Sequence, residues 1–315
     1  MTKKTIALLA GGVSNERDVS LKTGAKIFEA LDKNKYEVYR YDPKFDLVRF
    51  FNDAEAKKFN LVFPALHGPF GEDGRLQGML DLIGVPYVFS GCLASALAMD
   101  KIKTKLIAKA AGLELAEDLE LEKSNLIKPA EIINKLSFPI VIKPADSGSS
   151  VGVTIAKTDS ELENGLSEAF RHSRTVLLEK FIQGRELTVA VMGFGKNSHA
   201  LPVIEIIPKV STWFDHKAKY EVGGSEEVCP AQIPDAIRDR VQADAVKIYK
   251  AIGCKDLARS DFIWSESDNK LYFLEINTIP GMTATSLAPQ AARAAGMEFS
   301  EFLDRLIEGA YKQNK

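Results

Sequence analysis

The stretch that decides the fold is residues 257–277, LARSDFIWSESDNKLYFLEIN. It contains two runs of β-branched, aromatic and aliphatic residues, 257–264 and 270–277, which predict two strands. The small and polar residues between them, Ser265–Asn269, are typical of a turn. Residues 257–277 therefore predict an antiparallel hairpin, and its polar positions indicate its chemistry.

Four polar side chains occupy matching positions on this hairpin. Residues two apart on a strand share a face, so Arg259 shares a face with Asp261. On the partner strand, Glu275 shares a face with Asn277. Two carboxylates and an amide oxygen suit magnesium or manganese, whereas zinc prefers histidine and cysteine. The flanking residues are apolar, and burying two carboxylates without a cation is costly, so a metal site is favoured over a row of solvated surface residues.

The first hundred residues alternate between β-rich runs and helical stretches, which predicts a parallel, doubly wound sheet. A helix is expected at Ser20–Leu31, and strands are expected at Ile6–Ala10, Glu37–Tyr41, Leu61–Ala65 and Val85–Phe89. The loops Gly11–Asp18 and His67–Arg75 follow strand ends, where open α/β sheets place ligands. Both loops are therefore candidates for substrate contact.

The middle of the chain contains a candidate phosphate site. It has no G-x-x-x-x-G-K-[ST] loop, and no G-x-G-x-x-G fingerprint follows the first strand, which excludes the two common phosphate motifs. Instead, the expected strand Phe138–Pro144 carries Lys143 near its end, and the loop Asp146–Ser150 leads into a second expected strand, Val151–Ile155. Small residues in such a hairpin loop let backbone N–H groups approach phosphate oxygens. A plain turn explains the loop alone equally well.

The remaining helices and strands are expected to alternate on either side of a domain boundary near Gly184. Helices are expected at 94–112, 160–172, 233–252 and 287–311, and strands at 176–179 and 187–192. The chain contains no internal repeat or low-complexity tract.

The segment Gly148–Gly152 also matches G-x-S-x-G, the nucleophile elbow of serine hydrolases, with Ser150 as the attacking group. An elbow requires a strand, a sharp turn and then a helix, whereas strand-forming residues follow this loop. No matching acid and histidine are evident downstream. A serine hydrolase is therefore the less favoured hypothesis.

Length and composition narrow the class of protein. At 315 residues the chain is long enough for two or three domains. Apolar residues make up 45% and charged residues 27%, and the net charge of −2 comes without a basic block that would bind nucleic acid. The three cysteines form no C-x-x-C pair, and no apolar run is long enough to predict a membrane span. The expected location is the cytoplasm.

Several motifs together resemble the ATP-grasp superfamily and, within it, the D-alanine–D-alanine ligase family. The superfamily resemblance rests on the order of Lys143, the Gly148–Ser150 loop, Glu179–Ile182, Arg259, Asp261, Glu275 and Asn277. The family resemblance rests on the stretches His67–Gly74 (HGPFGEDG), Ser147–Gly152 (SGSSVG) and Leu274–Thr283 (LEINTIPGMT). The match spans nearly the whole chain.

The resemblance implies a three-domain ATP-grasp fold of α/β and α+β character. Its units would be an N-terminal domain with the doubly wound parallel sheet at 1–97, a central subdomain at 98–184 and a C-terminal subdomain at 185–315 that carries the metal ligands. It also implies ATP-dependent condensation of two D-alanine molecules through D-alanyl phosphate, for peptidoglycan precursor synthesis. Relatives are commonly homodimers through the N-terminal domain, and the apolar surface around Leu47–Phe51 is compatible with that.

The resemblance also assigns a set of ATP contacts. They are Lys101, Lys143, Ser150, Glu179, Lys180, Ile182, Glu186, Trp213 and Lys219. The two lysines Lys101 and Lys143 would hold phosphates, residues 179–182 would bind the adenine edge, and Glu186 would bind the ribose hydroxyls. Trp213 would lie against adenine, although a hydrophobic anchor for its loop is an alternative. Two Mg²⁺ or Mn²⁺ ions that bridge the phosphates would be held by Asp261, Glu275 and Asn277.

For the amino acids, the resemblance implies substrate contacts from Glu16, His67, Ser286 and Leu287, and catalytic roles for Glu16, Ser149, Tyr220, Arg259 and Gly281. Glu16 would hold the ammonium group of the first D-alanine, with Ser149 and Tyr220 linked to it. His67 would sit near the first carboxylate, although a histidine that caps its own turn is an alternative. Ser286 would receive the second carboxylate. An oxyanion would be stabilised by Arg259 and the backbone N–H of Gly281.

The stretch Trp213–Tyr220 resembles the mobile omega loop of the family, with Lys219 reaching the γ-phosphate. It would act as a lid that keeps water away from the acyl phosphate. His216 and Lys217 differ from the Tyr-Glu expected in the family, which puts the dynamics of the loop in doubt. Tyr220 favours an amine acceptor over D-lactate. The remaining alternative is a nucleotide-binding regulator without catalysis, which the retention of every expected ligand disfavours.

Overall fold

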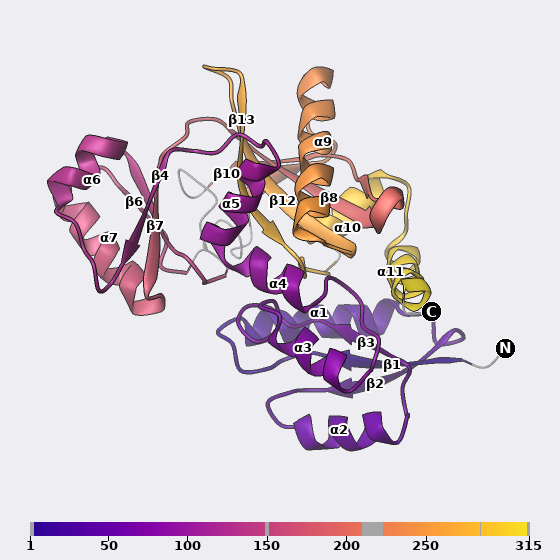
Figure 1. The fold of residues 1–315 in the computed structure, drawn as a ribbon. Helices are drawn as coiled ribbons and strands as arrows, with labels where there is room; N and C mark the ends of the chain where they lie inside the picture. Colours follow the sequence, from indigo (N-terminus) through magenta and orange to yellow (C-terminus); the bar gives the residue numbers. More distant parts are fainter. Residues whose placement is uncertain (1–2, 149–150, 210–222, 284, 314–315) are drawn as a thin grey trace.

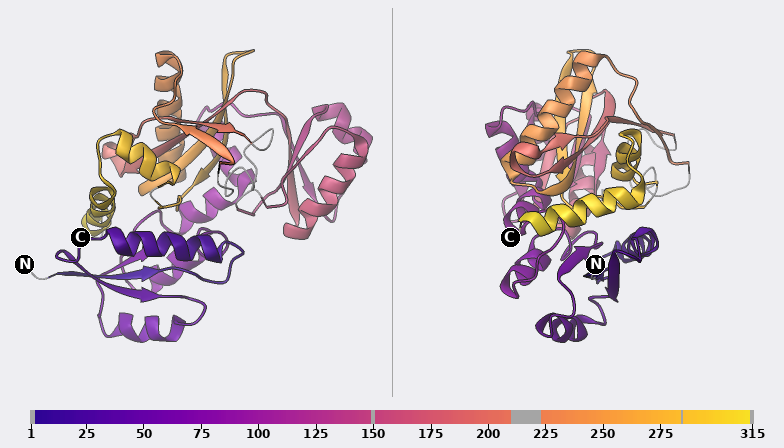
Figure 2. Two further views of the ribbon diagram at one scale, coloured as in Figure 1. Left: turned by 180° about the vertical axis from the view of Figure 1, so that it is seen from behind. Right: turned by 90° about the vertical axis from the view of Figure 1, so that its right-hand side faces the viewer.

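The computed structural model describes residues 3–148, 151–209, 223–283 and 285–313. Its strands form three separate sheets, shown in Figure 1 with the helices that cover them. Both views in Figure 2 show the N-terminal sheet beneath the largest sheet, and the left-hand view shows the remaining sheet to one side of them. The candidate site residues come from all three.

The N-terminal sheet is parallel and has the order β2-β1-β3. Its elements are β1 (Lys4–Leu9), α1 (Arg17–Ala30), β2 (Tyr36–Tyr41), α2 (Leu47–Glu55), β3 (Leu61–Pro64) and α3 (Arg75–Leu82). Helix α1 lies on one side of the sheet and α2 on the other, which is the doubly wound arrangement that the sequence predicts (Figure 1).

The prediction of a strand at residues 85–89 is wrong, because this segment forms only a single isolated β-bridge, between Val62 and Tyr87. The backbone of Phe89 takes a positive φ of 77°, which ends the extended run. The N–H of Phe89 then donates to the carboxylate of Asp256 at 2.9 Å and not to a neighbouring strand.

The second sheet is antiparallel and has the order β4-β7-β5-β6. Its strands are β4 (Asp118–Glu122), β5 (Ile140–Pro144), β6 (Thr154–Ala156) and β7 (Thr175–Lys180), and its helices are α6 (Pro129–Leu136) and α7 (Asp159–His172). The hairpin expected around Lys143 is confirmed, because Ile142 pairs with Thr154 and Ile140 with Ala156. Both helices lie on the same side of the sheet, which leaves its other side toward the rest of the molecule (Figure 1).

The largest sheet has the order β11-β10-β8-β12-β13, with β9 paired to β8. Its elements are β8 (Arg185–Gly193), the 3-10 turn η1 (Gly195–Asn197), β9 (His199–Ala200), β10 (Ile204–Pro208), β11 (Ser225–Val228), α9 (Asp235–Ile252), β12 (Asp256–Ser265) and β13 (Lys270–Asn277). Strands β12 and β13 form the antiparallel hairpin that residues 257–277 predict.

Two helices expected to be continuous are each divided. The first divides into α4 (Cys92–Met99) and α5 (Lys101–Ala110), because Asp100 is extended and its carboxylate caps α5 by accepting the N–H groups of Ile102 and Lys103 at 3.0 Å. The second divides into α10 (Leu287–Ala294) and α11 (Phe299–Gln313), where Gly296 takes a positive φ of 84° that ends a helix readily.

One hydrophobic core joins the N-terminal and largest sheets. It contains residues of β1 and β3, residues of β8 and β10, and the buried faces of α10 and α11, such as Phe302 and Ile307. The second sheet has a separate core beneath α6 and α7. The two cores explain why the second sheet stands apart in Figure 2.

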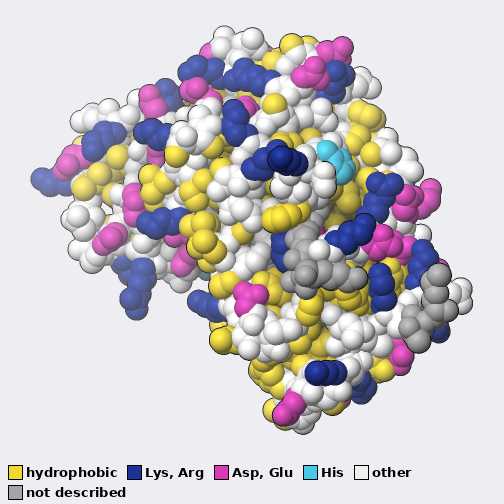
Figure 3. All heavy atoms as spheres, turned by 45° about the vertical axis from the view of Figure 1, so that its right-hand side comes forward, with side chains coloured by type: hydrophobic (Ala, Val, Ile, Leu, Met, Phe, Trp, Pro, Cys, Tyr) yellow, Lys and Arg dark blue, Asp and Glu magenta, His cyan; other side chains and the backbone are white. Residues whose placement is uncertain are grey.

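Basic and acidic side chains are interspersed on the face of the molecule shown in Figure 3. In the described part of the chain, no helix combines the length and the apolar character needed to cross a bilayer.

Candidate functional site

The polar residues of the β12–β13 hairpin lie on one face, as the sequence predicts. Arg259 pairs with Asn277 and Asp261 pairs with Glu275 in the register of the two strands, and directly opposed side chains lie on the same side of a sheet. The carboxylate of Asp261 is buried and accepts bonds from Arg259 Nε and Nη2 at 2.9 and 2.8 Å. It also accepts a bond from the hydroxyl of Thr188 at 2.5 Å.

This group of oxygens fits magnesium or manganese. Asp261 and Glu275 supply two opposed carboxylates, and the amide oxygen of Asn277 is held in place by the N–H of Ile279 at 2.8 Å. Among the described residues, no group of three or more His, Cys, Asp and Glu side chains is arranged to hold a metal. The available set is therefore two carboxylates and an amide, which hard oxygen-seeking cations accept and zinc does not favour.

A cavity of about 120 Å³ lies between the second sheet and the largest sheet. Its lining includes residues predicted to bind ATP or metal, namely Lys101, Lys143, Glu179, Lys180, Ile182, Glu186, Asp261 and Glu275. Its other walls are apolar, from Val141 and Ile155 on one sheet and from Ile263 and Leu274 on the other. Apolar walls together with charged side chains are what a nucleotide base and its phosphates require of a binding cavity.

In the lining of this cavity, the carboxylate of Glu179 lies between two lysines, an arrangement that the sequence does not predict. Both oxygens of Glu179 are occupied, one by Lys143 Nζ and the other by Lys105 Nζ, each at 2.5 Å. Burial alone would raise the pKa of Glu179, but the two ammonium groups lower it to about 2. Burial likewise opposes the charge on Lys143, yet Glu179 raises the pKa of that amine above its usual value. Glu179 and Lys143 are therefore both charged at neutral pH.

A second, smaller cavity of about 60 Å³ shares Lys101 and Glu275 with the first. It is also lined by Glu72, Gly148 and Asn277. The Nζ of Lys101 donates to the backbone oxygen of Ser147 at 2.5 Å, which ties α5 to the loop after β5. Lys101 and Glu275 therefore separate the nucleotide-shaped cavity from a small polar space beside it.

The residues predicted to bind the first substrate lie next to this polar space. A Cβ atom placed on Gly68 would lie 2.6 Å from Glu16 Oε2, and one on Gly148 would lie 3.3 Å from the same oxygen. The N–H of Gly68 donates to Glu72 Oε2 at 2.7 Å. Two loops distant in sequence thus approach the Glu16 carboxylate, and glycines make the approach possible.

His67 is buried and does not cap its own turn, so that alternative is wrong. Its Nε2 lies 3.0 Å from the hydroxyl of Thr23 on α1, and its Nδ1 lies 3.7 Å from Glu72 Oε1. Glu72 lies within the motif at residues 67–74, but the sequence predicts no role for it in the site. Its carboxylate accepts the N–H of Gly68 and lies beside the ring of His67.

Gly281 and Ser286 also lie together. The hydroxyl of Ser286 is 2.9 Å from where a Cβ of Gly281 would stand, and it accepts the N–H of Thr283 at 3.1 Å. Ser286 is the N-terminal cap residue of α10, so its hydroxyl lies where unpaired backbone N–H groups favour an anion. The side chain of Leu287 is buried in the core, which leaves its backbone as the part able to contact a ligand.

Five predicted site residues lie outside the described residues, namely Ser149, Ser150, Trp213, Lys219 and Tyr220.

The described residues around Ser150 disfavour a nucleophile elbow, because the chain continues into the strand β6 and not into a helix. No matching acid and histidine are evident downstream in the sequence, but the structure does place one such pair beside this loop. His172 lies beside Gly152 and pairs with Glu168 at 3.1 Å, from Nε2 to Oε1. His172 is exposed at the end of α7, and neither residue lines the cavities described above.

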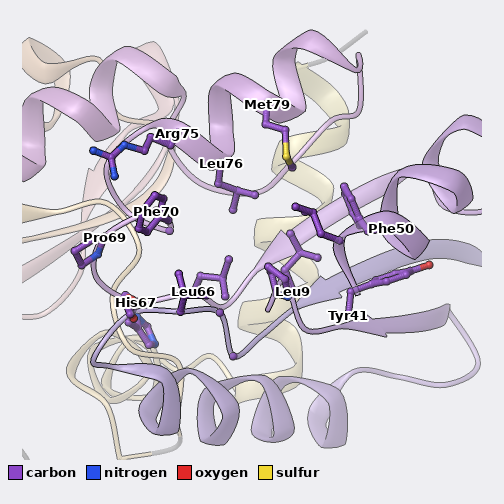
Figure 4. A pocket seen from close by; sticks show the side chains of 17 residues that line it. Leu9, Tyr41, Phe50, Leu66, His67, Pro69, Phe70, Arg75, Leu76 and Met79 are labelled. Atoms are coloured by element: carbon purple, nitrogen blue, oxygen red, sulfur yellow. Dashed lines mark hydrogen bonds between the residues drawn. The ribbon is translucent and has the colours of Figure 1, made fainter. Parts of the chain in front are cut away.

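A further cavity of about 310 Å³ lies in the N-terminal part of the molecule, and His67 contributes to its wall. Figure 4 shows that apolar side chains such as Leu66, Leu76 and Met79 line it. Ligand sites need convergent polar groups that fix orientation, and these are gathered at the cavities near Lys101. We therefore place the candidate site between the sheets.

Comparison with known proteins assigns a family to this geometry. Residues 40–92 match the family model for the D-ala D-ala ligase N-terminus, and residues 107–308 match the model for its C-terminus. The chain is 46% identical over 309 residues to a D-alanine–D-alanine ligase of Syntrophobacter fumaroxidans, and the alignment covers 97% of each chain.

Solved structures agree with this assignment. The chain is 34% identical to a D-alanine–D-alanine ligase from Bacillus anthracis complexed with ATP, with a TM-score of 0.85 and 99% and 98% of the two chains covered. It is 32% identical to a D-Ala:D-Ser ligase from Enterococcus faecalis, with a TM-score of 0.82 and 98% and 99% covered.

Proposed function

The chain belongs to the D-alanine–D-alanine ligase family, and we propose that it joins two D-alanine molecules while ATP is converted to ADP and phosphate. One observation supports this most directly: Lys101 and Glu275 line both the nucleotide-shaped cavity and the polar space beside Glu16. A phosphoryl group held between them would be within reach of both substrates. The product serves as a precursor of peptidoglycan.

ATP would enter the cavity between the two sheets. The apolar walls suit the adenine ring, and the backbone of residues 179–182 would meet its edge, as β7 ends at Lys180. Glu186 lies in the same lining and would accept the ribose hydroxyls. Lys101 and Lys143 would hold phosphate oxygens as point charges. Lys219 and Trp213 would complete the site from the lid.

Two Mg²⁺ or Mn²⁺ ions would be held by Asp261, Glu275 and Asn277. When bound, they would neutralise charge that develops on the β- and γ-phosphate oxygens. In the structure, Arg259 donates to both oxygens of Asp261. Binding of cations would release Arg259 from this pair and leave its guanidinium available to a substrate oxygen.

The first D-alanine would lie beside Glu16, which accepts a charge-assisted hydrogen bond from its ammonium group. His67, with Glu72 beside it, would lie near the carboxylate of the first D-alanine. The carboxylate of the second D-alanine would lie at the start of α10, near Ser286 and the backbone N–H of Leu287. Ser149 and Tyr220 would close the site over both substrates.

The reaction would proceed in two steps. A carboxylate oxygen of the first D-alanine attacks the γ-phosphorus of ATP, the bond to the β-phosphate oxygen breaks, and ADP leaves. The amine of the second D-alanine, after loss of a proton, then attacks the carbonyl carbon of the acyl phosphate. Arg259 and the N–H of Gly281 stabilise the tetrahedral oxyanion until the C–O bond to phosphate breaks and the dipeptide forms.

The lid and the acceptor preference are part of the proposal. Residues 213–220 would exclude water from the acyl phosphate, which water hydrolyses readily. Tyr220 favours an amine acceptor over D-lactate. Because a D-Ala:D-Ser ligase is among the structural neighbours, D-serine is the informative competing acceptor.

We also propose the division of the chain into units at 1–97, 98–184 and 185–315, and a homodimer in the cytoplasm. Support for the dimer comes from α2, where Leu47 and Val48 are exposed, and from Phe45 just before it, which is also exposed. Burial of these side chains against a second copy would remove an apolar patch from water. A monomer in sedimentation equilibrium at micromolar concentration would contradict the dimer.

The activity is tested by phosphate release from Mg-ATP with one added substrate at a time. We expect release with D-alanine, together with stoichiometric D-alanyl-D-alanine by mass spectrometry, and none with L-alanine or D-lactate alone. D-Serine mixed with D-alanine tests the acceptor. Release that does not depend on any amino acid would point to a different ATP-grasp activity and overturn the proposal.

A further inference from the structure

Lys105 is a buried cation with no role in the reaction described above. Its side chain comes from the second turn of α5 and is only 5% exposed. Its ammonium lies 2.5 Å from Glu179 Oε1, 3.2 Å from the backbone oxygen of Ala116 and 3.6 Å from Asp118 Oδ1. A buried lysine of this kind needs its charge compensated, because an unpaired ammonium is costly away from water.

The compensation comes chiefly from Glu179. The side chain of Glu179 is 4% exposed, whereas the side chain of Asp118 is 42% exposed, so water screens the attraction between Asp118 and Lys105. The other oxygen of Glu179 is 2.5 Å from Lys143 Nζ. Lys105, Glu179 and Lys143 therefore form a row in which one negative charge is shared by two positive charges. We call these three residues the lysine bridge.

The net charge of the lysine bridge matters because basic and acidic side chains nearly balance in the cavity in front of it. Its lining contains three lysines, Lys101, Lys143 and Lys180, against four acids, Glu179, Glu186, Asp261 and Glu275. Glu275 and Glu186 both act on Lys143 electrostatically. Behind this lining Arg259 pairs with Asp261 and Lys105 pairs with Glu179. Together with these two cations the lining has a net charge of plus one toward an entering polyphosphate, and removal of Lys105 would reduce it to zero.

We propose that Lys105 is a positioning residue for the nucleotide phosphates, acting through Glu179 on Lys143. By holding one oxygen of Glu179, it fixes the other oxygen where it directs the Lys143 ammonium into the cavity. By sharing the negative charge, it leaves the lysine bridge with a net charge of plus one for an incoming phosphate. Without Lys105, Glu179 and Lys143 would be a neutral pair that attracts phosphate weakly.

The test measures binding and not turnover. It uses calorimetric titration of the full chain with Mg-ADP and, separately, with adenosine. In Lys105→Met we expect Mg-ADP affinity to fall about tenfold, the order of effect for one unit charge near a partly buried anion. Adenosine affinity should remain unchanged, because it carries no phosphate. Lys109→Met makes the same chemical change at an exposed position of the same helix and should bind both ligands like the wild type.

A second variant separates charge balance from mere packing. Lys105→Met/Glu179→Gln has a net bridge charge of plus one again, carried by Lys143 alone. We expect it to recover most of the Mg-ADP affinity lost in Lys105→Met, whereas a packing role would make the two losses add. Should Lys105→Met fail to fold in a thermal melt, Lys105→Gln keeps a donor for Glu179 and is compared with the same double variant.

Two results would overturn the inference: wild-type Mg-ADP affinity in Lys105→Met, or a double variant that binds Mg-ADP no more tightly than the single one. An equal loss of adenosine binding would assign Lys105 to the adenine end and equally contradict the inference. The inference rests on the proposed function only in taking the cavity as a nucleotide site. Absence of Mg-ADP binding by the wild-type chain would defeat that assignment itself, and so the two failures are distinguishable.

Discussion

At the scale of single residues, chemistry depends on charges held in place before the substrate arrives. Lys143 is fixed by Glu179, and Glu275 stands opposite Asp261 in the strand register. We predict that Lys143→Ala and Glu275→Gln each lower turnover by about 10²–10³-fold, the loss typical of a preorganised charge contact. Steady-state assays of phosphate release check this. Lys196→Ala, at an exposed turn, is the control and should be unaffected. Near-normal turnover in both variants would refute the assigned roles.

The lysine bridge also predicts a pH dependence of stability. The pKa of Glu179 is lowered from its usual 4.5 to about 2 by the two lysines. A carboxyl group with a lowered pKa stabilises the fold fully above pH 4.5, and this contribution is lost as the pH falls toward 2. Urea unfolding at pH 6 and pH 3.5 should show a larger loss of unfolding free energy in the wild type than in Glu179→Gln. Equal losses would contradict the charged state assigned to Glu179.

Much of the site could be predicted from local sequence, and the reason is strand periodicity. Residues two apart share a face, so the convergence of Arg259, Asp261, Glu275 and Asn277 follows from the hairpin alone. Lys105 and Glu72 were not predicted. Lys105 forms an ion pair with Glu179, which lies 74 positions away in the sequence, and no local pattern predicts such a pairing. Glu72 acts on its own loop, but the sequence does not distinguish a buried carboxylate in a glycine-rich loop from one exposed to solvent.

At the scale of elements, the start of helix α5 determines the positions of Lys101 and Lys105. Asp100 interrupts what the sequence suggests is one helix, and its carboxylate caps α5 through two backbone N–H groups. We predict that Asp100→Ala lowers the free energy of unfolding by about 0.5–2 kcal/mol, whereas Asp100→Ser keeps most of it. Denaturant unfolding measures both. The same variant should raise the KM for ATP, because Lys101 and Lys105 lie in the first two turns of α5.

Elements whose identity depends on tertiary contacts were the ones that sequence patterns missed. Strand β4 reads as a charged segment, DLELE, and becomes a strand because it pairs with β7. The expected strand at 85–89 has the right composition, but Phe89 is diverted to a side-chain acceptor in β12. By contrast, the strands of the β5–β6 and β12–β13 hairpins have apolar runs bounded by turn residues, so local signals were sufficient.

At the scale of the whole molecule, α11 packs against both the N-terminal sheet and the largest sheet. Phe302 is fully buried in the core that contains residues of both. We predict that Phe302→Ala destabilises the protein by about 3–5 kcal/mol, as expected for deleting a buried aromatic ring. Phe194→Ala is the matched control, because that ring is 55% exposed. A loss in Phe302→Ala as small as that in the control would contradict the shared core.

The separate core of the second sheet has a consequence for the nucleotide cavity. Because β5 and β7 belong to one core and β12 and β13 to another, the cavity lies where two packed units meet. Small shifts between the units would change its width without disturbing either core. A change in the width of the cavity therefore needs no local unfolding.

The central claim is that a D-alanine carboxylate is activated by transfer of the γ-phosphoryl group. D-Alanine labelled with ¹⁸O in its carboxylate tests this directly, because the oxygen that attacks phosphorus must leave with phosphate when the peptide bond forms. The account predicts that inorganic phosphate released with each D-alanyl-D-alanine carries one ¹⁸O atom, measured by mass spectrometry. Label in AMP, or phosphate without label, would contradict it.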